Sequence, residues 1–79
     1  MQVRYPVFCS GKCVGVFDSK DDVAKTVEAT YSKVPSIAIE REETPTATKF
    51  VVKYREGNKR VWRVYTVYTA RVYDRPDHF

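Results

Sequence analysis

The sequence has few of the residues on which metal and acid–base chemistry depend. Its 79 residues include one histidine, His78, and two cysteines, Cys9 and Cys13. The C-x-x-x-C spacing supplies two thiolates, whereas a structural zinc site needs four ligands. Two cysteines are also too few for a disulfide scaffold. We therefore expect two reduced cysteines, no metal and no cofactor.

Glycine is equally scarce, and its positions exclude a phosphate-binding loop. Gly11, Gly15 and Gly57 are scattered among predicted hairpins rather than clustered in a glycine-rich motif. Most carboxylates fall in a predicted helix start, a loop or the C-terminal tail, where they are solvated rather than paired for catalysis. The sequence therefore predicts a protein that is not an enzyme.

Long apolar runs are absent too. No segment approaches the roughly 18 apolar residues of a membrane-spanning helix. The first residues, MQVRYPVFCSGKC, lack the basic start, apolar stretch and small-residue cleavage site of a secretory signal. We expect a protein of the cytoplasm that does not enter a membrane.

What the chain does have is an uneven excess of positive charge. The net charge is +4, yet residues 1–43 hold six basic and seven acidic side chains, whereas residues 44–79 hold eight basic and three acidic ones. Such asymmetry favours an anionic partner for the C-terminal half, either a nucleic acid or an acidic protein surface.

The length predicts one domain over residues 1–79 with one small core, followed by a polar and flexible tail over residues 74–79. Alternating apolar residues predict a hairpin over residues 2–17 with a two-residue Ser10-Gly11 loop. In that register Val7 faces Val14 and Tyr5 faces Val16. Pro6 has no amide donor, which favours an edge or a bulge.

A single helix of about 13 residues is expected next. Asp18 or Ser19 caps its start, and an apolar stripe follows at helical spacing. Pro35 ends it, because proline disfavours helical geometry in the residue before it. The stripe consists of Val23, Ala24, Val27, Tyr31 and Val34.

Three more strands are predicted, over residues 36–41, 47–55 and 60–73, with a polar connection over 42–46. The order ββαβββ predicts a small two-layer α+β domain: a mostly antiparallel sheet with one helix packed on one face. A strand of 13 residues would span about 43 Å at 3.3 Å per residue, so we expect the last one to bend or overhang.

The faces of the two long strands depend on the turn between them. A three-residue loop, Glu56-Gly57-Asn58 with a left-handed Asn58, keeps apolar residues together, whereas a two-residue Gly57-Asn58 loop pairs Tyr54 with Val61 and mixes the faces. We predict the three-residue loop. It directs the even-numbered residues to the core: Phe50, Val52, Tyr54, Trp62, Val64, Tyr68, Ala70 and Val72.

The odd-numbered residues then form the candidate binding face. They combine cations, which bind phosphates or carboxylates, with tyrosines, which stack on bases or anchor protein interfaces. The solvated side of any antiparallel sheet carries similar residues, so this face has a purely structural interpretation as well. Its candidate partner-binding residues are Lys49, Lys53, Arg55, Arg63, Tyr65, Arg71 and Tyr73.

Three valines on the same face, Val51, Val61 and Val67, favour a protein partner, because phosphate binding does not need an apolar centre. The leading hypothesis is a module that masks an acidic surface of a larger protein, with Arg63, Tyr65, Arg71 and Tyr73 as anchors. In size and composition the chain resembles the small regulators and inhibitors encoded by bacteriophages.

Two other partners stay open. A nucleic acid could use the same face, with Lys49, Lys53 and Arg63 on phosphates and Tyr65 or Tyr73 under bases. A second copy of the chain could cover the face through the overhanging last strand, which would make a homodimer.

Overall fold

The computed structural model describes residues 2–72, in which one helix packs on one face of an antiparallel sheet. The predicted α+β class and the element order ββαβββ are confirmed, with a further short strand at the end. The predicted tail and Tyr73 lie outside the described residues. The elements are β1 Gln2–Cys9, β2 Lys12–Phe17, α1 Lys20–Thr30, β3 Ala38–Glu43, β4 Thr48–Glu56, β5 Lys59–Val67 and β6 Ala70–Val72.

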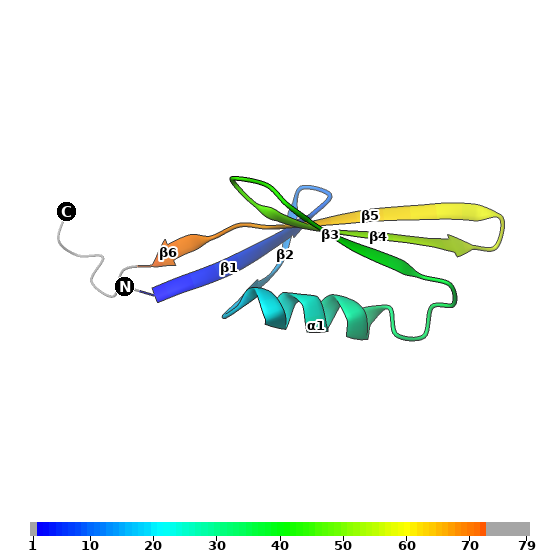
Figure 1. Cartoon of the computed structure of the whole chain (residues 1–79), viewed down its shortest axis with the longest axis horizontal. Helices are drawn as coiled ribbons and strands as arrows, with labels where there is room; N and C mark the ends of the chain where they lie inside the picture. Colours follow the sequence, from blue (N-terminus) through cyan, green and yellow to red (C-terminus); the bar gives the residue numbers. More distant parts are fainter. Residues whose placement is uncertain (1, 73–79) are drawn as a thin grey trace.

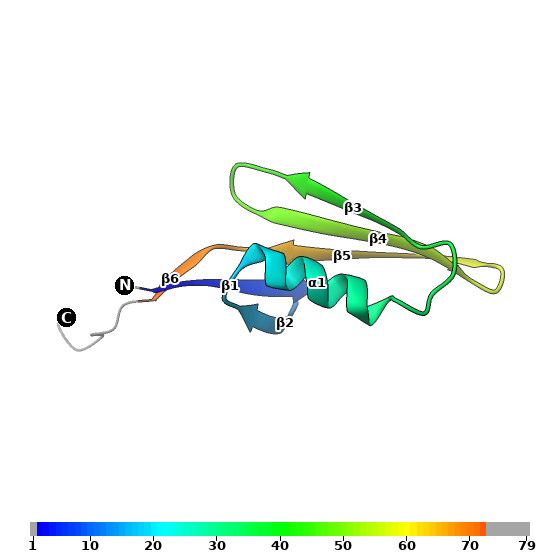
Figure 2. The ribbon, with the colours of Figure 1, turned by 60° about the horizontal axis from the view of Figure 1, so that its bottom comes forward.

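The strands lie in the order β2-β1-β5-β4-β3, and β6 pairs with the start of β1. Figures 1 and 2 show α1 along one side of the sheet, while the β4–β5 hairpin projects beyond the end of the helix. The other side of the sheet carries no helix within residues 2–72. Within residues 2–72, no helix is both long enough and apolar enough to cross a membrane.

The first hairpin has the predicted Ser10-Gly11 turn, but its register shifts beyond Phe8. Cys9 pairs with Lys12 and Phe8 with Cys13, after which a bulge makes Val7 pair with Gly15. The predicted pairing of Val7 with Val14 is therefore wrong. An extra residue in one strand displaces every later pair by one position.

Pro6 lies neither at a sheet edge nor within a continuous ladder. On the side of β1 away from β2, residues Val7–Cys9 pair with β5 and residues Gln2–Arg4 pair with β6. Pro6 stands between these two segments, where its carbonyl accepts a hydrogen bond from the Tyr68 amide. A residue without an amide donor is tolerated at this change of partner because no ladder bond is lost.

The helix begins as predicted. The Ser19 side chain accepts a hydrogen bond from the Asp22 amide, and acidic residues occupy the first turn, where the helix dipole favours them. The helix ends at Thr30, earlier than predicted, and Tyr31 forms its C-terminal cap.

The core lies between α1 and the sheet. Val23 and Val27 on the helix are buried against Val7, Val52 and Val67 on three different strands. Phe50 and Tyr31 complete the buried cluster, and Thr48 is fully buried beside it. Most of these side chains are small, so the helix can approach the sheet closely.

The turn between β4 and β5 differs from the predicted three-residue loop. Glu56 pairs with Lys59, so the turn contains only Gly57 and Asn58, and Gly57 has a φ of 63°. A positive φ at the first central residue is typical of type II′ hairpin turns, which glycine favours. The expected left-handed Asn58 is wrong, since positive φ among non-glycine residues is confined to Ser10 and Ser36 within residues 2–72.

This turn reverses the faces of β5 relative to the prediction. Tyr54 pairs with Val61 and Val52 with Arg63, so the odd-numbered residues of β5 face the helix. Val67 is 1% exposed, whereas Trp62, expected in the core, is 68% exposed. A one-residue change of register moves every side chain of a strand to the other face. All residues of β5 were therefore predicted on the wrong face.

The predicted last strand does not continue to residue 73 as one piece. It is interrupted after Val67, and β6 then pairs with β1 rather than with β4. The expected bend is therefore confirmed. The last described residues pair with β1 instead of overhanging the sheet.

Candidate binding surface

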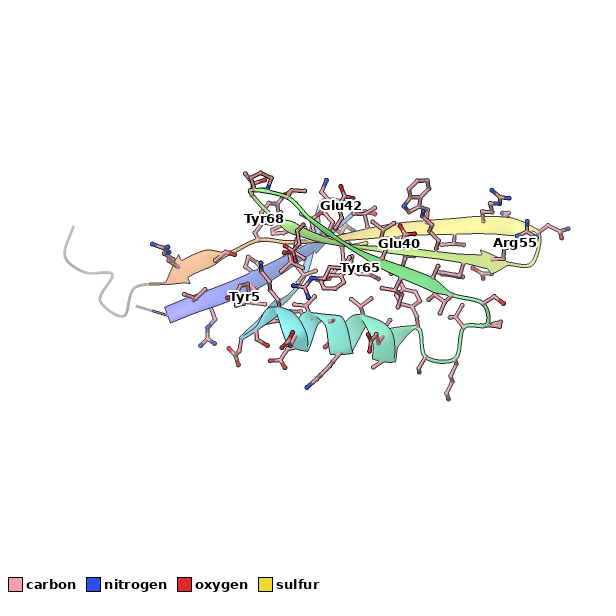
Figure 3. The ribbon with its side chains drawn as sticks, viewed as in Figure 1. Tyr5, Glu40, Glu42, Arg55, Tyr65 and Tyr68 are labelled. Atoms are coloured by element: carbon pink, nitrogen blue, oxygen red, sulfur yellow. The ribbon has the colours of Figure 1, made fainter. Side chains whose placement is uncertain are left out.

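The side of the sheet away from α1, here called the open face, carries the exposed aromatic and basic side chains of the hairpin. Cross-strand pairs place Lys53 beside Trp62, Arg55 beside Arg60 and Val51 beside Val64. Figure 3 shows Tyr68 and Glu42 on this side and Tyr65 on the side of the helix. The open face carries Phe8, Ala38, Glu40, Glu42, Lys49, Val51, Lys53, Arg55, Arg60, Trp62, Val64, Thr66 and Tyr68, and at its β2 margin Cys13 and Val16.

Trp62 is the most prominent apolar group of this face. Its side chain is 68% exposed, and the Nζ atom of Lys53 lies 4.9 Å from its ring centroid. The neighbouring Val64 is 37% exposed. An exposed tryptophan beside a valine and a lysine offers a large apolar contact with cations at its margin, which is the composition of an interface anchor.

Two arginines face each other at the end of the same hairpin. Arg55 and Arg60 are direct cross-strand partners, both side chains are exposed, and neither forms an ion pair within residues 2–72. Like charges opposite each other in a sheet destabilise it. An anionic group bound between them would remove this repulsion.

Acidic residues are confined to the other margin of the open face. Glu40 and Glu42 lie on the edge strand β3, and the Oε2 atom of Glu40 is 3.6 Å from the Nζ atom of Lys53. The positive potential therefore increases from β3 towards the tip of the β4–β5 hairpin, where the two arginines lie.

A second aromatic group lies at the opposite end of the open face. The rings of Phe8 and Tyr68 meet edge to face, with centroids 5.7 Å apart. They line an open depression together with Ser10, Gly11, Val64 and Thr66. This depression carries no charged side chain.

The structure does not bring the predicted site residues together. Lys49, Lys53 and Arg55 lie on the open face, whereas Arg63 and Tyr65 lie on the helix side. Arg71 is exposed in β6, opposite Val3 of β1. Tyr73 lies outside the described residues. The prediction of one shared face is wrong because it depended on the three-residue turn.

Tyr65 and Arg63 belong instead to a group of polar contacts beside the core. The hydroxyl oxygens of Tyr65 and Tyr31 are 2.5 Å apart, and the Tyr31 ring also packs on Tyr54. Burial, together with this hydrogen bond, raises the pKa of Tyr31 above its ordinary value. A hydrogen bond with Tyr54 raises the pKa of Arg63 above its ordinary value. These contacts join the end of α1 to β4 and β5.

The valines that favoured a protein partner also differ from the prediction in their positions. Val67 is buried in the core between the helix and the sheet, and Val61 is half-buried on the same side of the sheet, opposite Tyr54. Val51 does lie on the open face but is only 8% exposed. The apolar contribution to the open face comes instead from Trp62 and Val64, and from Tyr68 and Phe8.

Sequence reasoning missed Trp62, Arg60 and Tyr68 as surface residues. The signal that would have found them is the Gly57-Asn58 pair, since glycine followed by asparagine is a common two-residue hairpin loop. A two-residue loop at Gly57-Asn58 places Trp62 and Arg60 on the same face as Lys53 and Arg55.

The two thiols are free, Cys9 half-buried and Cys13 exposed. They occupy opposite sides of the hairpin, because Cys9 pairs with Lys12 while Cys13 pairs with Phe8. Within residues 2–72 no three of the His, Cys, Asp and Glu side chains are grouped so that they could hold a metal ion.

Comparison of the chain with protein-family models, curated proteins and solved structures gives no match.

Proposed function

We propose that this protein is a non-catalytic binding module, a regulator or inhibitor, that docks its open face on an acidic surface of a larger protein and masks it. The observation that carries the proposal is the 68% exposed side chain of Trp62 on a sheet face that no helix of the described residues covers. Tryptophan and arginine are the residues most enriched in interface hot spots. The free thiols of Cys9 and Cys13 are compatible with a reducing cytoplasm as its location.

Charge supports an acidic partner. Arg55 and Arg60 repel each other across the hairpin and have no carboxylate partner within residues 2–72. A carboxylate from the partner would pair with both guanidinium groups and remove the repulsion. Lys49 and Lys53 extend the same positive surface towards the middle of β4.

A nucleic acid is the second candidate, because cations and exposed aromatic rings on an open sheet also bind single strands. The spacing of the rings favours a protein. Trp62 and Tyr68 are six residues apart, about 20 Å along an extended chain at 3.3 Å per residue. Successive bases stack a few ångströms apart, whereas separate anchors suit a broad protein surface.

The test is affinity capture from a lysate of the source organism with the tagged wild-type protein and two double variants. Arg55→Glu/Arg60→Glu reverses the charge of the hairpin tip. Lys25→Glu/Lys33→Glu makes the same charge change at exposed positions on α1 and in the loop after it. We expect one protein in stoichiometric amount, retained by the control variant and lost by the arginine variant.

Nuclease treatment and salt distinguish the two candidates. A protein partner survives nuclease, and its affinity falls modestly between low and physiological salt. A nucleic acid disappears with nuclease, and contact with four phosphates of a single strand would weaken its binding by tens of fold between 50 and 200 mM salt, since log K falls by about 0.7 per contact per log unit of salt. Loss of capture in the control variant as well would contradict a role for the open face.

A further inference from the structure

The edge strand β2 exposes apolar side chains along an unpaired backbone. Within residues 2–72 its only neighbouring strand is β1. Val14 is 55% exposed and Val16 is 61% exposed, and no charged residue occurs from Cys13 to Phe17. An edge of this kind is a template for pairing with another strand.

The opposite edge of the sheet is built differently. β3 is also an outer strand, but four consecutive residues, Glu40, Arg41, Glu42 and Glu43, are charged and exposed. Charged edge residues prevent pairing with other chains. The contrast shows that one edge is protected by charge and the other, β2, is not.

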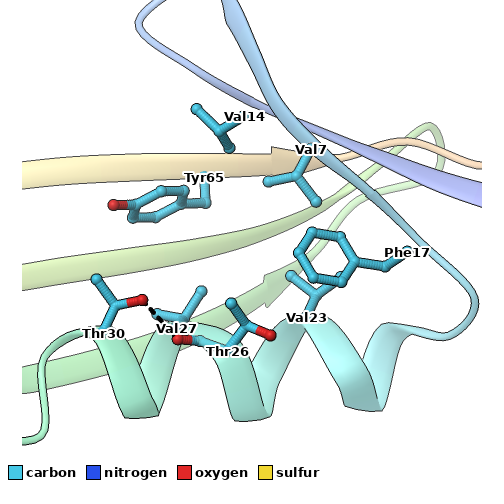
Figure 4. Close-up of a pocket in the computed structure, with 8 residues that line it drawn as sticks. All are labelled: Val7, Val14, Phe17, Val23, Thr26, Val27, Thr30 and Tyr65. Atoms are coloured by element: carbon cyan, nitrogen blue, oxygen red, sulfur yellow. Dashed lines mark hydrogen bonds between the residues drawn. The ribbon is translucent and has the colours of Figure 1, made fainter.

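An apolar groove of about 240 Å³ opens beside β2 on the helix side (Figure 4). The bulge in β2 turns Val14 towards this groove, and the Phe17 ring lies over Gly15, where a Cβ atom would come within 2.9 Å of it. Within residues 2–72 the lining is uncharged: Val7, Val14, Phe17, Val23, Thr26, Val27, Thr30 and Tyr65. A strand added to β2 places every second side chain on this side of the sheet, next to the groove.

We propose that the occupant of this edge is β2 of a second copy of the chain, paired antiparallel across a two-fold axis. The strand is followed by the acidic Asp18 and begins with the basic Lys12, both exposed. Asp18 already pairs with Arg4 in its own chain but stays 75% exposed. Antiparallel pairing brings the Lys12 end of each copy to the Asp18 end of the other, so the ends attract in both places.

Charge also disfavours the open face as the self-association surface. Two copies meeting there would oppose Lys53, Arg55 and Arg60 of one to the same cations of the other, which like-charge repulsion disfavours. The uncharged middle of β2 has no such penalty. The β2 dimer therefore joins two sheets edge to edge and leaves both open faces free.

The test is sedimentation equilibrium of the full chain over a wide concentration range, with reducing agent present so that exposed Cys13 cannot cross-link copies. We expect a reversible monomer–dimer equilibrium. Val16→Lys introduces a charge into the uncharged middle of the edge and weakens dimerisation by more than about tenfold, because a charged edge residue prevents strand pairing. Val64→Lys, the same change at an exposed strand position of the open face, leaves dimerisation unaltered.

Val14→Lys serves as a second edge variant and has the same expected effect as Val16→Lys. Both valines are more than half exposed, so the monomer folds, which circular dichroism verifies. A wild-type chain that stays monomeric at every concentration overturns the proposal, as does a dimer that both edge variants retain. A dimer lost in Val64→Lys alone assigns the contact to the open face and overturns it too.

The proposed dimer and the proposed function can be overturned independently of each other. Loss of partner capture in the arginine variant with an intact dimer, and loss of the dimer in Val16→Lys with intact capture, are separate results.

Discussion

Lys53 stands between Trp62 and Glu40 on the open face: its Nζ atom lies 4.9 Å from the indole centroid and 3.6 Å from the carboxylate Oε2. The lysine ammonium lies over the ring and also forms an ion pair with Glu40 on the edge strand. An exposed cation–π contact contributes only about 0.5–1 kcal/mol. Trp62 is therefore held in place without being part of the core.

Trp62→Ala is expected to change folding stability little. Because the side chain is mostly exposed, the free energy of unfolding should fall by less than about 1 kcal/mol. Val52→Ala, at a fully buried position of the neighbouring strand, should cost on the order of 2 kcal/mol. Urea denaturation followed by circular dichroism measures both. Equal losses in the two variants would show that Trp62 is packed in the core.

The hydroxyls of Tyr31 and Tyr65 are expected to be energetically coupled. Tyr31→Phe leaves the Tyr65 hydroxyl without its partner in a part-buried site, which should cost about 1 kcal/mol. Tyr65→Phe should cost a similar amount. The double variant should lose little more than either single one, because no unpaired hydroxyl remains. Strictly additive losses in a double-mutant cycle would contradict the hydrogen bond.

Glu43 is expected to make part of the stability dependent on pH. Hydrogen bonds from Thr48 and then Arg41 lower the pKa of Glu43 below its usual value of 4.5. Its contribution is therefore present above that value and is lost as the pH falls through the lower pKa of the folded state. Thr48→Val removes the larger cause, so the pKa of Glu43 should rise.

Carboxyl-carbon NMR titration of the wild type and of Thr48→Val measures this directly. Unfolding experiments below pH 4.5 should show a smaller loss of stability on acidification in the variant than in the wild type. Thr48→Val can also change the baseline stability, since Thr48 is buried, so the comparison uses the slope with pH. An unchanged Glu43 titration in the variant would contradict the assigned cause.

Ser10→Asn is expected to stabilise the first hairpin. Ser10 has a φ of 54° and Gly11 a φ of 79°, and asparagine tolerates a positive φ better than serine in a two-residue turn. The gain should be about 0.5 kcal/mol. Ser10→Val, a β-branched residue in the same conformation, should lose about 1 kcal/mol. Thermal denaturation of both variants checks the direction, and a destabilised Ser10→Asn would count against a left-handed Ser10.

Local interactions made several elements predictable from sequence. The start of α1 depends on Ser19 and the acids of the first turn, and the first hairpin turn depends on Ser10 and Gly11. These contacts join residues a few positions apart, so the sequence alone carries them. The bulge at Val14 was not predictable, because it becomes visible only when β2 is paired with β1.

The candidate surface shows the opposite case. Both alternating sets of β5 contain large apolar residues, Val61, Tyr65 and Val67 in one and Trp62 and Val64 in the other. Periodicity therefore could not decide which set meets the helix. It correctly placed Lys49, Lys53 and Arg55 on one face, but it added Arg63 and Tyr65 from the other.

The sequence by itself determined the class of fold, the order of the elements and the excess of positive charge after residue 43, since these follow from composition and from contacts between near neighbours. Tertiary structure decided that Trp62 is exposed and that Val67 is buried. The physical reason is the two-residue period of a strand: it fixes which side chains share a face, whereas the turn at Gly57 and the packing against α1 choose the face that is buried.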